Sequence, residues 1–165
     1  MLVKFIDARE DLSIQVHPDD ELARKRHGKS GKCEMWYVLE AEPGASLLTG
    51  FSRPIAPAEY ERRVADNTLT DVLNRQAIAS GDVFYLPAGR VHSIGKGSFI
   101  VEIQQVRTSP TGSDDFDRRD AAGNSRELHT ELAREAIDFE SSENSRITYA
   151  PENNQEVRLV TTPYF

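Results

Sequence analysis

The chain has 165 residues and a mass of 18.5 kDa, which allows one domain with its own core and argues against a multidomain assembly. Its composition, 38% hydrophobic and 28% charged, is that of a soluble globular protein rather than a disordered one. A net charge of −7 argues against a nucleic-acid partner, because a phosphate backbone would be repelled.

Short runs of β-branched and aromatic residues, each bounded by turn residues, recur along the chain and predict strands. In chain order these runs cover residues 2–6, 12–17, 35–39, 46–51, 83–86, 98–104, 146–149 and 157–164. Three helices are expected between them, at 19–27, 57–64 and 127–139. This order predicts an all-β sandwich or barrel with a few peripheral helices. Residues 109–124 are polar and glycine-containing, and we expect a long loop there.

Two features of the sequence indicate where in the cell the protein is found: its targeting segments and its cysteine content. No apolar run approaches the roughly 20 residues needed to cross a bilayer, and no basic and apolar leader opens the sequence. Cys33 is the only cysteine, so an internal disulfide and a cysteine-rich zinc site are excluded. We therefore predict a cytoplasmic protein that does not contact a membrane. The basic run at 24–29 is interpreted as a solvated helix end.

Four polar side chains have the spacing of a metal site. Gln15 and His17 are two residues apart in a predicted strand and would therefore point to the same face. Glu34 opens another strand, and His92 follows a tight turn after a third. Two imidazoles, a carboxylate and an amide oxygen suit a catalytic Zn²⁺ with an open position. From spacing alone, ordinary structural histidines remain the alternative. His27 and His129 lie on predicted helices, and we interpret them as surface residues.

Several strings of the sequence resemble type I mannose-6-phosphate isomerase. They are Leu-Val-Lys-Phe-Ile-Asp-Ala (2–8), Leu-Ser-Ile-Gln-Val-His-Pro-Asp-Asp (12–20), Gly-Lys-Cys-Glu-Met-Trp-Tyr (31–37), Gly-Asp-Val-Phe-Tyr-Leu-Pro-Ala-Gly-Arg-Val-His (81–92) and Glu-Ile-Gln-Gln (102–105). The resemblance extends over essentially the whole chain. It implies a cupin, or jelly-roll, β-barrel and a zinc-dependent interconversion of mannose 6-phosphate and fructose 6-phosphate.

The resemblance also implies roles for single residues. The zinc ligands of the family fall on Gln15, His17, Glu34 and His92, with one Zn²⁺ per chain, and Lys32 matches a family active-site lysine. That lysine would stabilise developing negative charge or hold the substrate phosphate. In an aldose–ketose isomerisation, a Lewis-acid metal stabilises the enediolate while a positioned base carries the proton.

The chain departs from the family pattern after residue 105. The aspartate and the catalytic arginine of relatives are replaced by Thr108 and Gly112. Arg107 is displaced by five positions, and a 1 Å misplacement can already cost about a hundredfold in rate. Cys33, where relatives commonly have threonine, is a milder change that we interpret as a buried, inert thiol. We therefore expect impaired isomerase activity.

Both ends of the sequence are apolar, at 2–6 and 157–165, whereas domain ends are usually polar. Together with the resemblance, this predicts that residues 1–165 form one incomplete cupin domain, the first and metal-bearing cupin of the family. The N-terminal strands and the second cupin unit of relatives would be absent. Open sheet edges would then favour self-association.

Three functions remain open at this point. The first is a zinc-dependent isomerase acting on a sugar phosphate. The second is a non-catalytic cupin module that binds a metal or a sugar phosphate. The third, a cupin oxygenase, fits less well, because such iron sites favour two histidines and one carboxylate without an amide ligand.

Overall fold

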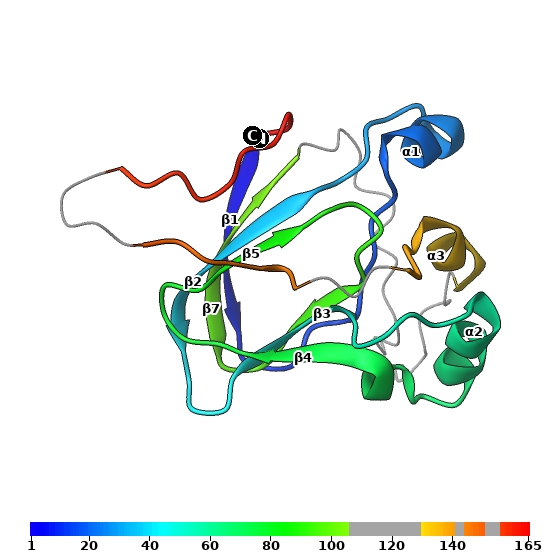
Figure 1. Ribbon diagram of the computed structural model, residues 1–165, viewed down its shortest axis with the longest axis horizontal. Helices are drawn as coiled ribbons and strands as arrows, with labels where there is room; N and C mark the ends of the chain where they lie inside the picture. The colour runs from blue at the N-terminus through cyan, green and yellow to red at the C-terminus, as the bar shows by residue number, and fades with distance from the viewer. Residues whose placement is uncertain (106–129, 141–143, 151–155) are drawn as a thin grey trace, which may run out of the picture.

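Two antiparallel β-sheets lie face to face and carry the helices on one side (Figure 1). The computed structural model describes residues 1–105, 130–140, 144–150 and 156–165. The larger sheet has the strand order β1-β7-β2-β5-β8, and the smaller sheet has the order β4-β3-β6. The helices α1, α2 and α3 lie together on the right-hand side of Figure 1. The predicted all-β class is confirmed, although the two sheets are not closed into a barrel within the described residues.

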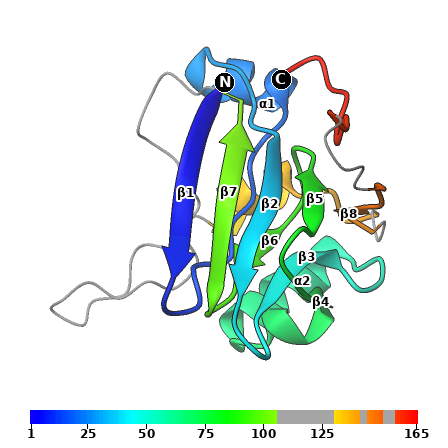
Figure 2. The same cartoon turned by 90° about the vertical axis from the view of Figure 1, so that its left-hand side faces the viewer.

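The larger sheet runs without interruption across its first three strands (Figure 2). Its members are β1 (Leu2–Ala8), β7 (Ser98–Gln104), β2 (Glu34–Ala41), β5 (Val83–Leu86) and β8 (Arg146–Ile147). Strand β7 buries every second residue, as expected for a strand with one face on the core. The register pairs Glu34 with both Gln104 and Leu86, so the start of β2 lies between two neighbouring strands at one end of the sheet.

The smaller sheet and the helices complete the fold. Its strands are β3 (Ser46–Phe51), β4 (Leu73–Ala77) and β6 (His92–Ile94), and a short 3₁₀ helix, η1 (Leu69–Val72), leads into β4. The helices are α1 (Asp20–His27), α2 (Pro57–Ala65) and α3 (Thr130–Ala136). No helix among the described residues combines the length and the apolar character needed to cross a membrane.

Apolar side chains form two cores, one on each face of the smaller sheet. Between the sheets, Leu47 and Ile94 pack with residues of the larger sheet such as Phe84. On the outer face, Phe51 and Tyr60 join η1 and α3 in a second cluster. Burying an apolar side chain of this size contributes about 1.5–3 kcal/mol, so these clusters hold the strands in register around the space between the sheets.

The helix predictions are confirmed, with α3 shorter than expected. Asp19 caps α1 by accepting a hydrogen bond of 2.8 Å from the backbone N–H of Leu22, and Gly28 ends the helix with φ of 64°. Pro57 opens α2, where a missing N–H carries no cost. Helix α3 ends at Ala136, and the predicted helix residues 127–129 lie outside the described residues, as does the predicted loop at 109–124.

Three predicted strands need correction, and two observed strands were not predicted. Residues 12–17 make only an isolated bridge between Gln15 and His92, and residues 157–164 have no regular structure. The predicted strand at 146–149 shrinks to the two residues of β8. Strands β4 and β6 were not predicted, because β4 contains a single large apolar residue and β6 has three residues, too few to show an alternating pattern.

Candidate metal centre

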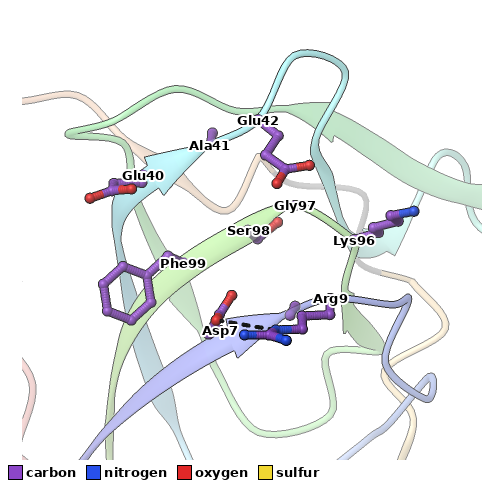
Figure 3. Close-up of a pocket in the computed structure, with 10 residues that line it drawn as sticks. Asp7, Arg9, Glu40, Ala41, Glu42, Lys96, Gly97, Ser98 and Phe99 are labelled. Carbon is purple, nitrogen blue, oxygen red and sulfur yellow. Dashed lines mark ion pairs between the residues drawn. The ribbon is translucent and has the colours of Figure 1, made fainter.

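A cavity of about 430 Å³ lies at one end of β1, β2 and β7 (Figure 3). Its charged side chains come from exposed positions, and Asp7 pairs with Arg9 at 3.8 Å. None of its lining residues carries a buried polar atom without a partner. Buried polar side chains are found instead towards the opposite end of the same three strands.

Three buried side chains converge there between the two sheets. His17 is 3% exposed, Glu34 is 1% exposed and His92 is 4% exposed. One ligand atom from each lies within 4.8 Å of the others, an arrangement that can hold a metal ion. The three residues come from the segment before α1, from the start of β2 and from the start of β6. The structure therefore brings together three of the four predicted ligands from distant parts of the chain.

The backbone around His17 explains this convergence. The backbone N–H of Gly89 donates to the carbonyl of His17 at 2.8 Å, and the N–H of Lys32 donates to the carbonyl of Pro18 at 3.2 Å. Gln15 and His92 exchange two backbone hydrogen bonds of 2.8 Å each. The segment is thus fastened to the loops that carry both other members of the cluster. These backbone hydrogen bonds position His17 without a regular strand ladder.

Glu34 is the negative centre of the cluster. Its Oε1 lies 3.1 Å from Nε2 of His17, and its Oε2 lies 3.7 Å from Nε2 of His92. The indole N–H of Trp36 donates to Oε2 at 3.1 Å. Burial by itself raises the pKa of Glu34, but the hydrogen bond from His17 and the electrostatic effects of His92, His17 and Lys32 outweigh it, so that the pKa lies well below its usual value. The carboxylate is therefore ionised at neutral pH.

The hydrogen bond at Nδ1 fixes the tautomer of His92. This nitrogen lies 2.7 Å from the backbone carbonyl of Arg90, which can only accept, so Nδ1 carries the proton. The lone pair of Nε2 then faces the carboxylate of Glu34, and a cation between these two acceptors would satisfy both. Metal-binding histidines typically donate their other ring N–H to a backbone carbonyl or a carboxylate in this way.

Both imidazoles are neutral in the folded chain. Burial lowers the pKa of His17 to about 3, although the hydrogen bond with Glu34 opposes this change. Burial also lowers the pKa of His92. The two rings lie 5.0 Å apart, and Nδ1 of His17 is buried without a hydrogen-bond partner. Neutral imidazole is the form that binds metals, so the protonation states suit a metal site.

Lys32 lies inside the cluster instead of at the surface. Its side chain is buried, and its ammonium group pairs with Oε1 of Glu34 and lies 3.2 Å from Nε2 of His17. A buried lysine needs such a partner, because an isolated ammonium group is costly to remove from water. Lys32 thus places positive charge beside the candidate metal position.

Gln15 lies beside the cluster on a small cavity of about 120 Å³. This cavity is also lined by Lys32, Glu34, Trp36 and His92. Because Gln15 and His92 face each other in a β-bridge, their side chains point to the same side. Complete ligand pockets usually measure about 300–1,000 Å³, so the cavity corresponds to the inner part of such a site.

Two residues that were not predicted from the sequence, Lys4 and Glu102, line the same cavity. Glu102 is buried on β7, and its Oε1 pairs with the ammonium group of Lys4 at 2.6 Å. Lys4 also donates to Oε1 of Gln104 at 2.6 Å. The register offers a signal that could have found them, because Lys4, Glu102 and Trp36 lie opposite one another on three neighbouring strands. A charged residue on the inner face of a core strand rarely occurs without a partner or a function.

The remaining sequence predictions have mixed outcomes. His27 is exposed at the end of α1, as expected, and Cys33 is buried and forms no disulfide. The family departures at Thr108 and Gly112 lie outside the described residues, as do Arg107 and His129.

Comparison with known proteins finds similarity to mannose-6-phosphate isomerases, although no family model matches the chain. It is 34% identical over its whole length to the mannose-6-phosphate isomerase of Streptococcus mutans and covers 52% of that protein. The chain is also 38% identical, over 83% of its length, to a probable mannose-6-phosphate isomerase of Bacillus subtilis, and it covers 44% of that protein. The crystal structure of the mannose 6-phosphate isomerase from Bacillus subtilis superposes with a TM-score of 0.77 at 30% identity, covering 99% of this chain and 52% of that one.

The two facing sheets and this superposition define a protein with the cupin fold of phosphomannose isomerases. The chain is a homologue of the mannose-6-phosphate isomerases and spans about half the length of the relatives it matches.

Proposed function

We propose that this chain is a zinc-dependent isomerase that interconverts mannose 6-phosphate and fructose 6-phosphate in the cytoplasm. One observation supports the proposal above all others, namely the buried cluster of His17, Glu34 and His92 in a homologue of mannose-6-phosphate isomerases. Residues 1–165 act as a single cupin domain, equivalent to the metal-bearing cupin of the family.

Gln15, His17, Glu34 and His92 would hold one Zn²⁺ per chain. The fit of the donor set rests on the lone pair at Nε2 of His92, on the ionised Glu34 and on the neutral imidazole of His17. Gln15 adds an amide oxygen from the wall of the same cavity. Two nitrogen and two oxygen donors match the borderline preference of Zn²⁺ and leave a position open to substrate.

The metal, when bound, supplies a Lewis acid that polarises the carbonyl and hydroxyl oxygens of the sugar. Lys32 keeps an ammonium group beside these oxygens and stabilises the negative charge that develops as a proton leaves carbon. Glu102 is buried, faces the same cavity and pairs with Lys4 at 2.6 Å, so it is our candidate for the group that carries the proton between the two carbons.

A coupled assay of fructose 6-phosphate formation tests the proposal. We expect turnover of mannose 6-phosphate by the zinc-loaded chain, loss of turnover on chelation and recovery on adding zinc back. His17→Ala should abolish both metal retention and turnover, whereas His27→Ala, at an exposed histidine, serves as the matched control and should leave both unchanged. Turnover that persists in the chelated chain would contradict the proposal.

A second candidate function is a module that binds a metal or a sugar phosphate without catalysis. The replacement of the family aspartate and arginine by Thr108 and Gly112 favours this alternative, since both proton handling and anion stabilisation would suffer. Zinc binding in a 1:1 ratio without turnover would identify the module. Low turnover that rises with Gly112→Arg would instead identify an impaired isomerase.

A further inference from the structure

The turn at residues 87–90 contacts both of the proposed histidine ligands. The backbone N–H of Gly89 donates to the carbonyl of His17 at 2.8 Å. Nδ1 of His92 donates to the carbonyl of Arg90 at 2.7 Å. A hydrogen bond of 3.2 Å between the backbones of its first and last residues closes the turn. A displacement of the turn would therefore shift the backbone of one imidazole and rotate the ring of the other.

The other side of the turn is fastened to the segment that follows α3. The backbone N–H of Asp138 donates to the carbonyl of Gly89 at 3.0 Å. A Cβ atom at Gly89 would lie 3.2 Å from Cβ of Asp138 and 3.3 Å from the carbonyl oxygen of Ala136. The φ of Gly89 is +85°, a left-handed value that glycine adopts at little cost. Gly89 is thus the point where the end of α3 is joined to the backbone of His17.

Helix α3 is held in place from both sides and from below. It lies between α1 and α2 in Figure 1. Arg26 of α1 donates to Glu135 at 2.6 Å, and Arg134 donates to Glu61 of α2 at 2.5 Å. Exposed ion pairs contribute little to stability. The main anchor is therefore Ile137, which is buried in the apolar cluster on the outer face of the smaller sheet.

We propose that Gly89 is a positioning residue that couples the position of α3 to the geometry of the metal centre. The coupling runs through two short backbone hydrogen bonds, from Asp138 to Gly89 and from Gly89 to His17. A metal site responds to small displacements, because ligand distances must agree with the preferred values to within about 0.2 Å. The inference rests on the proposed metal site, and its test distinguishes the failure of one from the failure of the other.

Two glycine variants test the coupling. Gly89→Ala places a Cβ atom against residues 136–138. Gly44→Ala is the matched control, because Gly44 has a φ of +87° and a Cβ atom there meets nothing within 4 Å. The strain of a left-handed alanine is thus common to both variants. We expect Gly89→Ala to weaken Co²⁺ binding at least about tenfold, as the loss of support for a metal ligand usually does. Gly44→Ala should bind Co²⁺ as the wild type does.

The visible absorption of bound Co²⁺ gives the affinity and a second readout. Its bands depend on the arrangement of the ligands, so Gly89→Ala should change their position or intensity at saturating metal. A variant that is only less stable would keep the bands of the wild type. Gly44→Ala provides that comparison within the same titration.

A second pair of variants perturbs α3 and leaves the turn intact. Ile137→Ala and Leu69→Ala each remove three carbon atoms from the same buried cluster, but only Ile137 is next to Asp138 in the chain. Both variants should lower the midpoint of urea unfolding. Only Ile137→Ala should also weaken Co²⁺ binding, by about twofold to thirtyfold, the usual range for coupling through packed elements. This pair decides the question if Gly89→Ala does not fold.

Three outcomes would count against the coupling. A wild type that binds one ion per chain, with Gly89→Ala and Ile137→Ala binding as tightly as their controls, overturns the coupling and leaves the metal site standing. A loss of affinity in Gly89→Ala without one in Ile137→Ala overturns the part assigned to α3. A wild-type chain that binds no ion overturns the metal site and the coupling together.

Discussion

At the scale of single residues, Trp36 is the least obvious contributor to the centre. Its indole N–H holds Oε2 of Glu34, and its ring meets His92 edge to face at 5.4 Å between centroids. Removing an outer-shell hydrogen bond of this type usually costs 10–100-fold in metal affinity. We therefore expect Trp36→Phe to weaken zinc binding by about tenfold in a competition titration with a chromogenic chelator. Tyr37→Phe, on the opposite face of the same strand, should leave the affinity unchanged.

The neutral imidazoles predict that the stability of the folded chain decreases in acid. In the unfolded chain His17 titrates near 6.5, whereas in the folded chain its pKa is about 3. The unfolded chain therefore binds more protons between these values, and stability falls as the pH drops from about 6.5 towards 3. His92 acts in the same direction. The loss approaches about 1.4 kcal/mol per pH unit for His17 alone.

Urea unfolding of the metal-free chain at pH 7.5 and pH 5.5 measures this loss. His17→Asn removes one titrating ring and should reduce the difference between the two pH values. Zinc affinity of the folded chain, in contrast, should change little over this range, because His17 stays neutral in it. An affinity that falls steeply below pH 6.5 would show that His17 is protonated in the folded chain.

The four proposed ligands were all predicted from the sequence through the family resemblance, and spacing alone left the question open. What the sequence could not supply was the environment of each group. A lysine is usually found at the protein surface. Lys32 is buried because its ammonium group pairs with Glu34 and lies close to His17. In the sequence, Glu102 is only one residue of a predicted strand, because its partner Lys4 lies 98 positions away and the pairing cannot be recognised.

At the scale of elements, the join between α1 and β2 depends on Gly31. A Cβ atom at this position would lie 2.5 Å from the backbone carbon of Asp19 and 2.6 Å from the carbonyl oxygen of Pro18. Backbone atoms cannot yield, so we expect Gly31→Ala to destabilise the chain by about 2 kcal/mol or more and to displace Lys32. Gly28→Ala is the control, because its Cβ meets open space and only the left-handed φ of 64° carries a cost of about 1 kcal/mol. Chemical denaturation of both variants gives the comparison.

Elements with strong local signals were predicted and elements held by tertiary contacts were not. Helices α1 and α2 carry their own caps, a capping aspartate and an N-terminal proline, and their bounds agree with the prediction to within one residue. Strand β4 reads Leu-Asn-Arg-Gln-Ala and has almost no apolar pattern, so its pairing with β3 decides its conformation. Residues 12–17 are the opposite case. Their sequence has the pattern of a strand, but they form only an isolated bridge because too few backbone partners lie beside them.

At the scale of the whole molecule, metal binding should contribute to stability. A ligand that binds only the folded state at a hundred times its Kd adds about 2.7 kcal/mol. For a chain of this size that corresponds to a rise in Tm of roughly 5–10 °C. We expect this rise when zinc is added to the chelated protein, measured by scanning calorimetry. His92→Ala should abolish the rise, whereas His27→Ala should preserve it.

The backbone ties that fasten residues 15–18 to two remote loops have a consequence for the order of events in folding. The centre requires the closure of loops that join residue 17 to residues 34 and 92, and such non-local closures are slow compared with the formation of helices. Capture of a spectroscopically visible ion such as Co²⁺ during refolding should therefore lag behind the recovery of helical circular dichroism. The colour of the bound ion would then report when the chain has reached its native topology.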